Sequence, residues 1–278
     1  MNEAWEDVSL YDLYKKAYTP WEWHAKIQER CIEKGLMFFS SPFDATSVDF
    51  LEKLNVPCFK VASFENTDIP LIRRIARTGK PVIVSTGMAT VSEIEDAVNT
   101  LRKEGCENFI LLKCTSSYPA TPQQTNLKTI ANMRELFGVH IGLSDHTMGI
   151  GVAAASVAFG AVLIEKHFTL SRAEGGVDSM FSLEPAEFKA LRIETERAWQ
   201  SLGVVKYGGT EAEEKSKQYR RSLYASKDIG EGETITESSV VCVRPALGLA
   251  PKYLDTIVGM KARRAIPKDT PMQWTDVN

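Results

Sequence analysis

The chain of 278 residues carries a net charge of −3, with 44% hydrophobic and 25% charged residues. This composition is ordinary for a globular protein of one large and one small domain, and its charge gives no argument for nucleic acid or an acidic membrane as partner. Because no apolar stretch could span a bilayer and the acidic start is unlike a signal peptide, we expect a cytoplasmic location. The five cysteines are scattered and contain no CxxC pair, which is typical of reduced thiols.

Strand and helix patterns alternate after an N-terminal helical region at 8–34. Short apolar runs predict strands at 36–39, 58–62, 82–84, 109–112, 139–143 and 162–164. Segments of helical length separate them at 47–54, 69–78, 91–103, 129–137 and 149–160. This alternation predicts an α/β domain with a parallel sheet.

The residues that follow these strands decide between a barrel and an open sheet. Each predicted strand ends in hydroxyl, carboxylate or imidazole side chains. An open sheet concentrates its chemistry at one switch point, whereas a (β/α) TIM-type barrel builds its reaction face from all strand ends. Such a barrel has eight strands, and the patterns indicate six. We therefore expect residues 1–202 to form a (β/α) barrel. Either two of its strands lie upstream of Met1 and are absent from this chain, or the chain is a shortened variant.

The C-terminal part contains an internal repeat. The segment ASKDIGEGETI from Ala225 is matched by ARRAIPKDTPM from Ala262, at an offset of 37 residues. Each copy has the pattern of strand, tight turn and strand, which predicts a small β-rich domain over 222–278. The glycine-containing and highly charged stretch at 203–221 is typical of a linker.

Two histidines follow neighbouring predicted strands. His146 and His167 are 21 residues apart in sequence, and a right-handed crossover brings the ends of two such parallel strands to the same edge. The pair is therefore a candidate site for a divalent metal. The alternative is that each is a hydrogen-bonded histidine at a strand end. Asp145 and Glu165, in the same polar bursts, are candidates for orienting a neighbouring side chain.

Lys60 lies within an apolar strand, CFKVAS, where a buried ammonium needs an anionic partner. It is a candidate ligand for a phosphate or carboxylate, and the alternative is an ion pair with Glu65 or another structural carboxylate. Serines at several strand ends could add donors around one anion, namely Ser41, Ser63, Ser85, Ser116 and Ser144. Together with a metal, this pocket suits polarised carbonyl chemistry on a phosphorylated substrate.

These residues lie in motifs that resemble a known family. In order and spacing, the chain is similar to the sialic acid synthase family of nonulosonic acid synthases at FKVASFEN, PVIVSTGM, LLKCTSSYP, IGLSDHT and IEKHFT. Members of that family join a metal-dependent barrel to an antifreeze-like (SAF) domain, in agreement with the repeat. Within that family, the chain is most similar to the pseudaminic acid branch. Three segments carry this similarity, namely YDLYKKAYTPWEWHAKI, RRSLYASKDIGEGE and RPALGLAPKYLDTIVGMKA.

The resemblance implies condensation of phosphoenolpyruvate with 2,4-diacetamido-2,4,6-trideoxy-L-altrose, an acetamido sugar, and release of phosphate. It implies that His146 and His167 bind a divalent metal, usually manganese, with magnesium or cobalt as alternatives. The implied phosphoenolpyruvate ligands are Lys60, Ser41, Ser63, Ser116 and Ser144. Glu65 matches a carboxylate that assists the water step, and Tyr118 and Asp178 match sugar contacts. Arg244 matches an arginine that reaches the partner's barrel, which implies a swapped homodimer.

Other functions stay open at this point. A sister enzyme making N-acetylneuraminic or legionaminic acid would share the same motifs. The resemblance also implies two further strands ahead of this chain, and without them the chain could be a non-catalytic sugar-binding protein. A metal-dependent phosphohydrolase could use the same two histidines.

Overall fold

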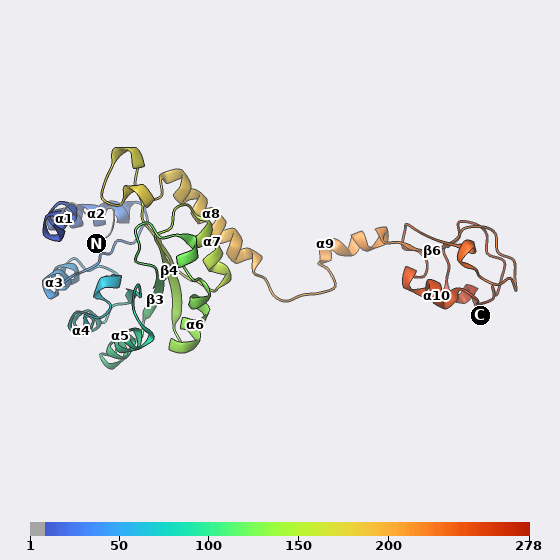
Figure 1. Cartoon of the computed structure of the whole chain (residues 1–278), viewed down its shortest axis with the longest axis horizontal. Helices are drawn as coiled ribbons and strands as arrows, with labels where there is room; N and C mark the ends of the chain where they lie inside the picture. The colour runs from blue at the N-terminus through green and yellow to red at the C-terminus, as the bar shows by residue number, and fades with distance from the viewer. Residues whose placement is uncertain (1–8) are drawn as a thin grey trace. The chain divides into compact units, whose positions relative to one another are not determined.

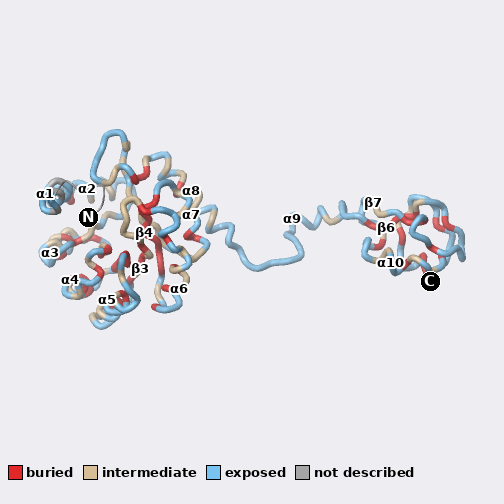
Figure 2. The backbone as a smooth tube through the Cα atoms, viewed as in Figure 1, coloured by how far each residue is buried: buried red, intermediate tan, exposed pale blue. Residues whose placement is uncertain are grey.

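The structure is a computed structural model that describes residues 9–278, so residues 1–8 of the predicted first domain lie outside the described part. The chain divides into two compact units, the first ending at Gly203 and the second covering Val204–Asn278. Each unit has its own group of buried side chains (Figure 2). Along residues 9–278, no helix is both long and apolar enough to cross a membrane.

The first unit contains one parallel sheet whose five strands follow the order of the sequence (Figure 1). The strands are β1 (Phe59–Val61), β2 (Val82–Ser85), β3 (Phe109–Cys114), β4 (His140–Asp145) and β5 (Ile164–Lys166). Each strand pairs in parallel with the next one along the chain. A curled sheet in sequence order is part of a (β/α) barrel, and this confirms the predicted fold class.

Helices precede the sheet, connect its strands and follow its last strand. They are α1 (Leu10–Ala17), α2 (Trp21–Glu33), α3 (Ala45–Lys53), α4 (Ile69–Ala76), α5 (Val91–Lys103), α6 (Lys128–Phe137), α7 (Gly151–Ala158) and α8 (Pro185–Ser201). In Figure 1 the helices lie around the outside of the curled sheet, from α3 at the left through α5 and α6 below to α8 at the right. The helical region predicted at 8–34 with a break at Pro20 is confirmed as two helices, because proline cannot continue α1 and is the N-cap of α2.

The two faces of the sheet differ because side chains alternate along each strand. Leu111, Ile141 and Leu143 belong to the hydrophobic core between sheet and helices. Lys60, Ser144 and Glu165 occupy the alternate face, which is the inside of the barrel, and their side chains meet there. The alternation of side chains thus gives the sheet a hydrophobic face toward the helices and a polar face inside the barrel.

Two predicted strands needed correction. The run at 36–39 forms no strand, and the Lys60 N–H donates to the Ser40 carbonyl at 3.4 Å beside this segment. Leu36 and Met37 are 61% and 80% exposed, so an apolar pattern there does not mark a buried strand. The last strand, predicted at 162–164, is Ile164–Lys166, because the register pairs Ser144 with Glu165. Part of the polar burst after the predicted strand therefore lies within β5.

The second unit is built from the repeat. Its antiparallel pair is β6 (Ser222–Ala225) and β7 (Val240–Val243), and short helices occur at α9 (Glu211–Glu214) and α10 (Leu254–Ile257). Ile229 and Ile266 occupy equivalent positions of the two copies, pair with each other and are buried. The two copies therefore interlock around one core. The predicted linker at 203–221 includes α9 and a 3-10 turn, Lys215–Tyr219.

Candidate active site

The two histidines lie side by side at the carboxyl ends of adjacent strands. His146 directly follows β4, His167 directly follows β5, and their ring centroids are 5.1 Å apart. The prediction that these two histidines lie close together in space is therefore confirmed. His146 is 5% exposed and the side chain of His167 is 31% exposed, so the pair has one buried ring and one ring that solvent can reach.

Each imidazole is oriented through one ring nitrogen. His146 Nδ1 lies 2.8 Å from the Thr115 carbonyl, which can only accept, so Nδ1 carries the proton and the lone pair is on Nε2. His167 Nδ1 lies 3.4 Å from Asp178 Oδ2. A carbonyl or carboxylate on the far nitrogen is the usual support for a metal-binding histidine. Both rings thus leave Nε2 for another ligand.

The pKa values of the two histidines are shifted in opposite directions. Burial lowers the pKa of His167, and the charge of the neighbouring His146 lowers it further. Burial opposes the charge on His146 as well, but its contacts with Cys114 and with the Thr115 carbonyl raise the pKa of this ring overall. His167 therefore stays neutral, as a metal ligand must, over a wider pH range than His146.

The donor set fits a divalent ion that completes its coordination with non-protein ligands. Within residues 9–278, no three His, Cys, Asp or Glu side chains gather closely enough to hold a metal ion. The two histidines are therefore a partial set. Imidazole nitrogens suit zinc, copper, iron or nickel, and oxygen ligands at the remaining positions suit manganese or magnesium. Open coordination positions are what a substrate-binding metal requires.

Aromatic rings enclose the histidines. The Tyr118 ring centroid is 4.3 Å from that of His146, and the Phe181 centroid is 5.0 Å from that of His167. Phe181 is only 2% exposed and also packs 5.7 Å from Tyr118. Burial raises the pKa of Tyr118 to about 12, so its hydroxyl stays protonated. Sequence patterns did not indicate Phe181, because it lies in a loop without periodicity.

Lys60 projects into the same interior and is 6% exposed. Its Nζ donates to the Val61 carbonyl at 2.9 Å and lies 3.6 Å from Glu165 Oε2. Glu165 Oε1 also accepts from the Ser144 hydroxyl at 2.8 Å. Burial lowers the pKa of Lys60, although Glu165 counteracts this. The nearest carboxylate is thus Glu165 rather than Glu65, and it is 38% exposed at its side chain.

Glu65 ends a 3-10 turn, Ser63–Glu65, that follows β1. Its Oε2 atom is buried without a hydrogen-bond partner among the described residues. Burial raises the pKa of this carboxyl, and the charge of Lys60 only partly offsets the effect. A buried carboxyl that is only partly satisfied is more often found at functional sites than elsewhere.

Serines converge around the backbone of Gly87. The Gly87 N–H donates to Ser63 Oγ at 3.1 Å. A Cβ at position 87 would lie 2.1 Å from Ser116 Oγ and 2.7 Å from Ser63 Oγ, so only glycine allows this approach. Ser85 Oγ is buried without a partner within residues 9–278. Small hydroxyl and backbone donors gathered in this way suit an oxyanion.

Three further residues of interest are Cys114, Ser41 and Arg244. The Sγ atom of the buried Cys114 lies 3.9 Å from His146 Nδ1. Burial raises the pKa of this thiol, but its contacts, that with His146 foremost, lower the pKa to about 7. Ser41 is half-buried and follows Ser40, whose carbonyl accepts from Lys60. Arg244 belongs to the second unit, where it is exposed directly after β7. Its predicted role toward a partner subunit stays a prediction.

A parallel barrel-like unit with paired histidines and a buried lysine, followed by a β-rich unit, defines the chain as an enzyme of the barrel type. The profile of the NeuB family matches residues 1–207 and that of the SAF domain matches residues 220–278. The chain belongs to the NeuB family, and this confirms the family expected from the motifs.

Several known proteins are similar to it. Pseudaminic acid synthase from Helicobacter pylori is 40% identical over 274 residues, which cover 98% of this chain and 81% of that protein. N,N'-diacetyllegionaminic acid synthase from Campylobacter jejuni is 38% identical over 265 residues, covering 94% and 78%. The crystal structure of N-acetylneuraminic acid synthetase from Leptospira borgpetersenii with citrate superposes with a TM-score of 0.70 at 35% identity, covering 77% and 76%.

Proposed function

We propose that the chain condenses phosphoenolpyruvate with 2,4-diacetamido-2,4,6-trideoxy-L-altrose to give pseudaminate and phosphate. The observation that carries this proposal is the pair of strand-end imidazoles 5.1 Å apart in a chain 40% identical to a pseudaminic acid synthase. The legionaminic acid synthase at 38% identity supports the alternative that a related sugar is the substrate.

His146 and His167 would hold a divalent ion through their Nε2 atoms, with manganese proposed and magnesium or cobalt as alternatives. When bound, that ion supplies Lewis-acid polarisation of the sugar aldehyde. The Thr115 carbonyl and Asp178 keep the two rings in place. Tyr118 and Asp178 also line the same space and would contact the sugar.

Lys60 would bind the anionic groups of phosphoenolpyruvate, because its buried amine has one partly exposed carboxylate as partner and can exchange it for a substrate anion. The serine donors assigned to the same substrate are Ser41, Ser63, Ser85, Ser116 and Ser144. Carbon 3 of phosphoenolpyruvate attacks the aldehyde carbon, water adds to carbon 2, and phosphate then leaves. Glu65 would accept the proton of that water, a role suited to a carboxyl whose pKa is raised by burial.

We also propose a swapped homodimer that works in the cytoplasm, with Arg244 of each chain completing the barrel site of its partner. An exposed arginine suits this role because its guanidinium can bind a polar acetamido group. Sedimentation of the purified chain tests the dimer. A mixture of R244M and H167N chains should regain activity if each subunit supplies what the other lacks.

The reaction is tested by supplying phosphoenolpyruvate, manganese and each acetamido sugar to the purified chain, and measuring phosphate release and product mass. We expect turnover with the altrose derivative and at least a hundredfold loss in H146N and H167N. Faster turnover with a neuraminate or legionaminate precursor would show that this other sugar is the substrate. Phosphate release without any sugar would indicate a phosphohydrolase, and silence with all sugars a non-catalytic sugar-binding protein.

A further inference from the structure

A buried ion pair lies directly beside the two histidines, on the other face of the sheet. Asp145 precedes His146, Lys166 precedes His167, and the two residues are register partners across β4 and β5. We infer that this pair sets the spacing of the two imidazoles and thereby the affinity of the site for a divalent ion. The inference rests on the metal site of the proposed function.

The pair is deeply buried on both sides. Lys166 Nζ lies 2.8 Å from Asp145 Oδ2, and the two side chains are 1% and 0% exposed. Every other ion pair formed by the described residues has at least one side chain more than a tenth exposed. Neither charge can be satisfied by water, so each depends on the other for its position.

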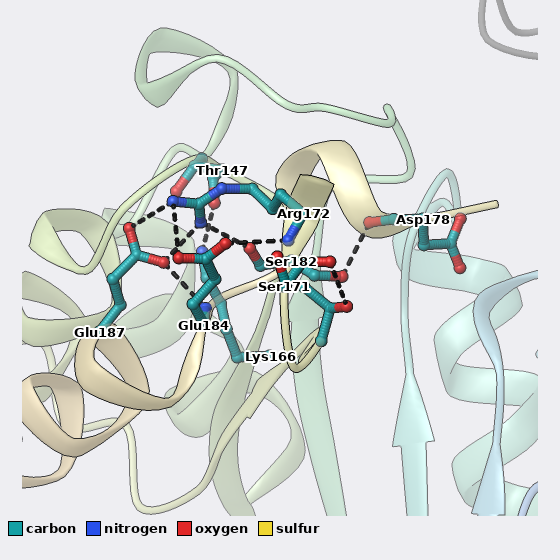
Figure 3. A network of polar contacts seen from close by, with 9 residues as sticks. Thr147, Lys166, Ser171, Arg172, Asp178, Ser182, Glu184 and Glu187 are labelled. Atoms are coloured by element: carbon teal, nitrogen blue, oxygen red, sulfur yellow. Dashed lines mark hydrogen bonds and ion pairs between the residues drawn. The ribbon is translucent and has the colours of Figure 1, made fainter. Parts of the chain in front are cut away.

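The pair also holds the residue on the far side of His146. Asp145 Oδ1 accepts from the Thr147 N–H at 2.9 Å. Lys166 Nζ donates to the Thr147 carbonyl, and both residues are labelled in Figure 3. Thr147 is fully buried. The backbone of His146 is therefore fixed before and after the imidazole by groups that belong to one ion pair.

Backbone pairing alone does not set the distance between the rings. The paired register of β4 and β5 ends at Asp145 and Lys166, one residue before each histidine. β5 itself has only three residues. Because side chains alternate, the ion pair lies on the outer face while both imidazoles point inward. The ion pair thus links β4 and β5 at their last paired residues, on the face of the sheet opposite to the histidines.

A buried ion pair is weak evidence for stability, since apolar replacements of similar size are often neutral or stabilising. A positional role makes a different prediction. In the double variant D145N/K166M no charge is left unpaired, so we expect a denaturation midpoint close to that of the native chain. The lysine link to Asp145 and Thr147 is lost, so we expect manganese to bind about 10–100-fold more weakly, as for other residues that orient metal ligands.

The experiment titrates the full-length chain with manganese, follows free Mn²⁺ by electron paramagnetic resonance, and measures urea unfolding of the same samples by circular dichroism. The control is R77M/E104Q, which removes the ion pairs that Glu104 forms with Arg77 at 2.8 Å and with Arg73 at 3.4 Å, between the C-terminal ends of α4 and α5. We expect native manganese affinity in this control and weakened affinity in D145N/K166M.

Native manganese affinity in a folded D145N/K166M variant overturns the inference while leaving the proposed function intact. If the native chain binds none of manganese, cobalt and magnesium, both are overturned. If the double variant does not fold, D145E replaces it, because this change keeps both charges and lengthens the acid by one methylene. Weakened binding in D145E supports the inference, and unchanged binding contradicts it.

Discussion

Glu65 and Lys60 illustrate how burial prepares single residues for chemistry. Both belong to the barrel interior. Burial lowers the pKa of Lys60 and raises that of Glu65, so in each case it favours the neutral form. A group of this kind gains or loses a proton more readily near neutral pH than an exposed group of the same type. The chemical roles proposed for them can be separated by substitutions that conserve shape.

We expect E65Q to lower kcat by about 10²–10⁴-fold with little change in the KM for phosphoenolpyruvate, because the amide cannot accept a proton. The native carboxyl must be ionised to act as base. Since its pKa is raised, activity should increase as the pH rises through that pKa, and this acidic limb should be absent from E65Q. Steady-state kinetics across pH measures both effects. Equal kcat in E65Q and the native chain would exclude Glu65 as the base.

We expect K60M to raise the KM for phosphoenolpyruvate by about 10–150-fold, the equivalent of a hydrogen bond to a charged group. The matched control is K113M. Lys113 is also a strand lysine that donates to the carbonyl of the next residue, Cys114, at 2.7 Å, but it alternates toward the helix face. Similar KM increases in both variants would show that the loss is not specific to the pocket.

At the scale of elements, the loop between β5 and α8 holds Asp178 against His167. Arg172 joins both ends of this loop, since its backbone N–H donates to Glu184 Oε1 at 2.8 Å and its guanidinium to Glu187 Oε2 at 2.5 Å and to the Ser182 carbonyl at 3.0 Å (Figure 3). The Ser182 hydroxyl in turn donates to the Asp178 carbonyl at 2.7 Å. The loop is thus tied to the first turn of α8.

We expect R172M to increase the KM for the sugar severalfold and to accelerate proteolytic cleavage between 170 and 184, because the loop loses its link to α8. Stability should change by less than about 1 kcal/mol, since the ion pairs of Arg172 are partly exposed. R197M, which removes an exposed ion pair further along α8, is the control. An unchanged KM together with unchanged cleavage would contradict a positioning role for Arg172.

For the whole molecule, the two units contain separate hydrophobic cores. Ile266 is completely buried in the second core, where it pairs with its repeat partner Ile229. We expect I266A to destabilise that unit by about 2–5 kcal/mol through loss of contacts and creation of a cavity. Hydrogen exchange followed by mass spectrometry should show lost protection within 204–278 and native protection within the first unit. Equal losses in both would show that the units unfold together.

Several features of the fold and site follow from local patterns. Alternating apolar runs predict the parallel sheet, and the crossover rule brings His146 and His167 together. The strand ends were less predictable. Ile164–Lys166 is shifted relative to its apolar pattern because pairing with β4 sets its register. The run at 36–39 has a strand-like composition without the burial that a strand requires.

The amino-acid sequence was sufficient to predict the parallel order of the strands, the division into two units and the polar side chains that follow the strands, because these depend on periodicity and chain connectivity. The folded structure was needed to show that Lys60 faces Glu165, that Phe181 packs on both imidazoles, and that Asp145 and Lys166 form a buried pair. Such contacts join residues distant in sequence. They depend on register, twist and packing, which arise only when the whole sheet is assembled.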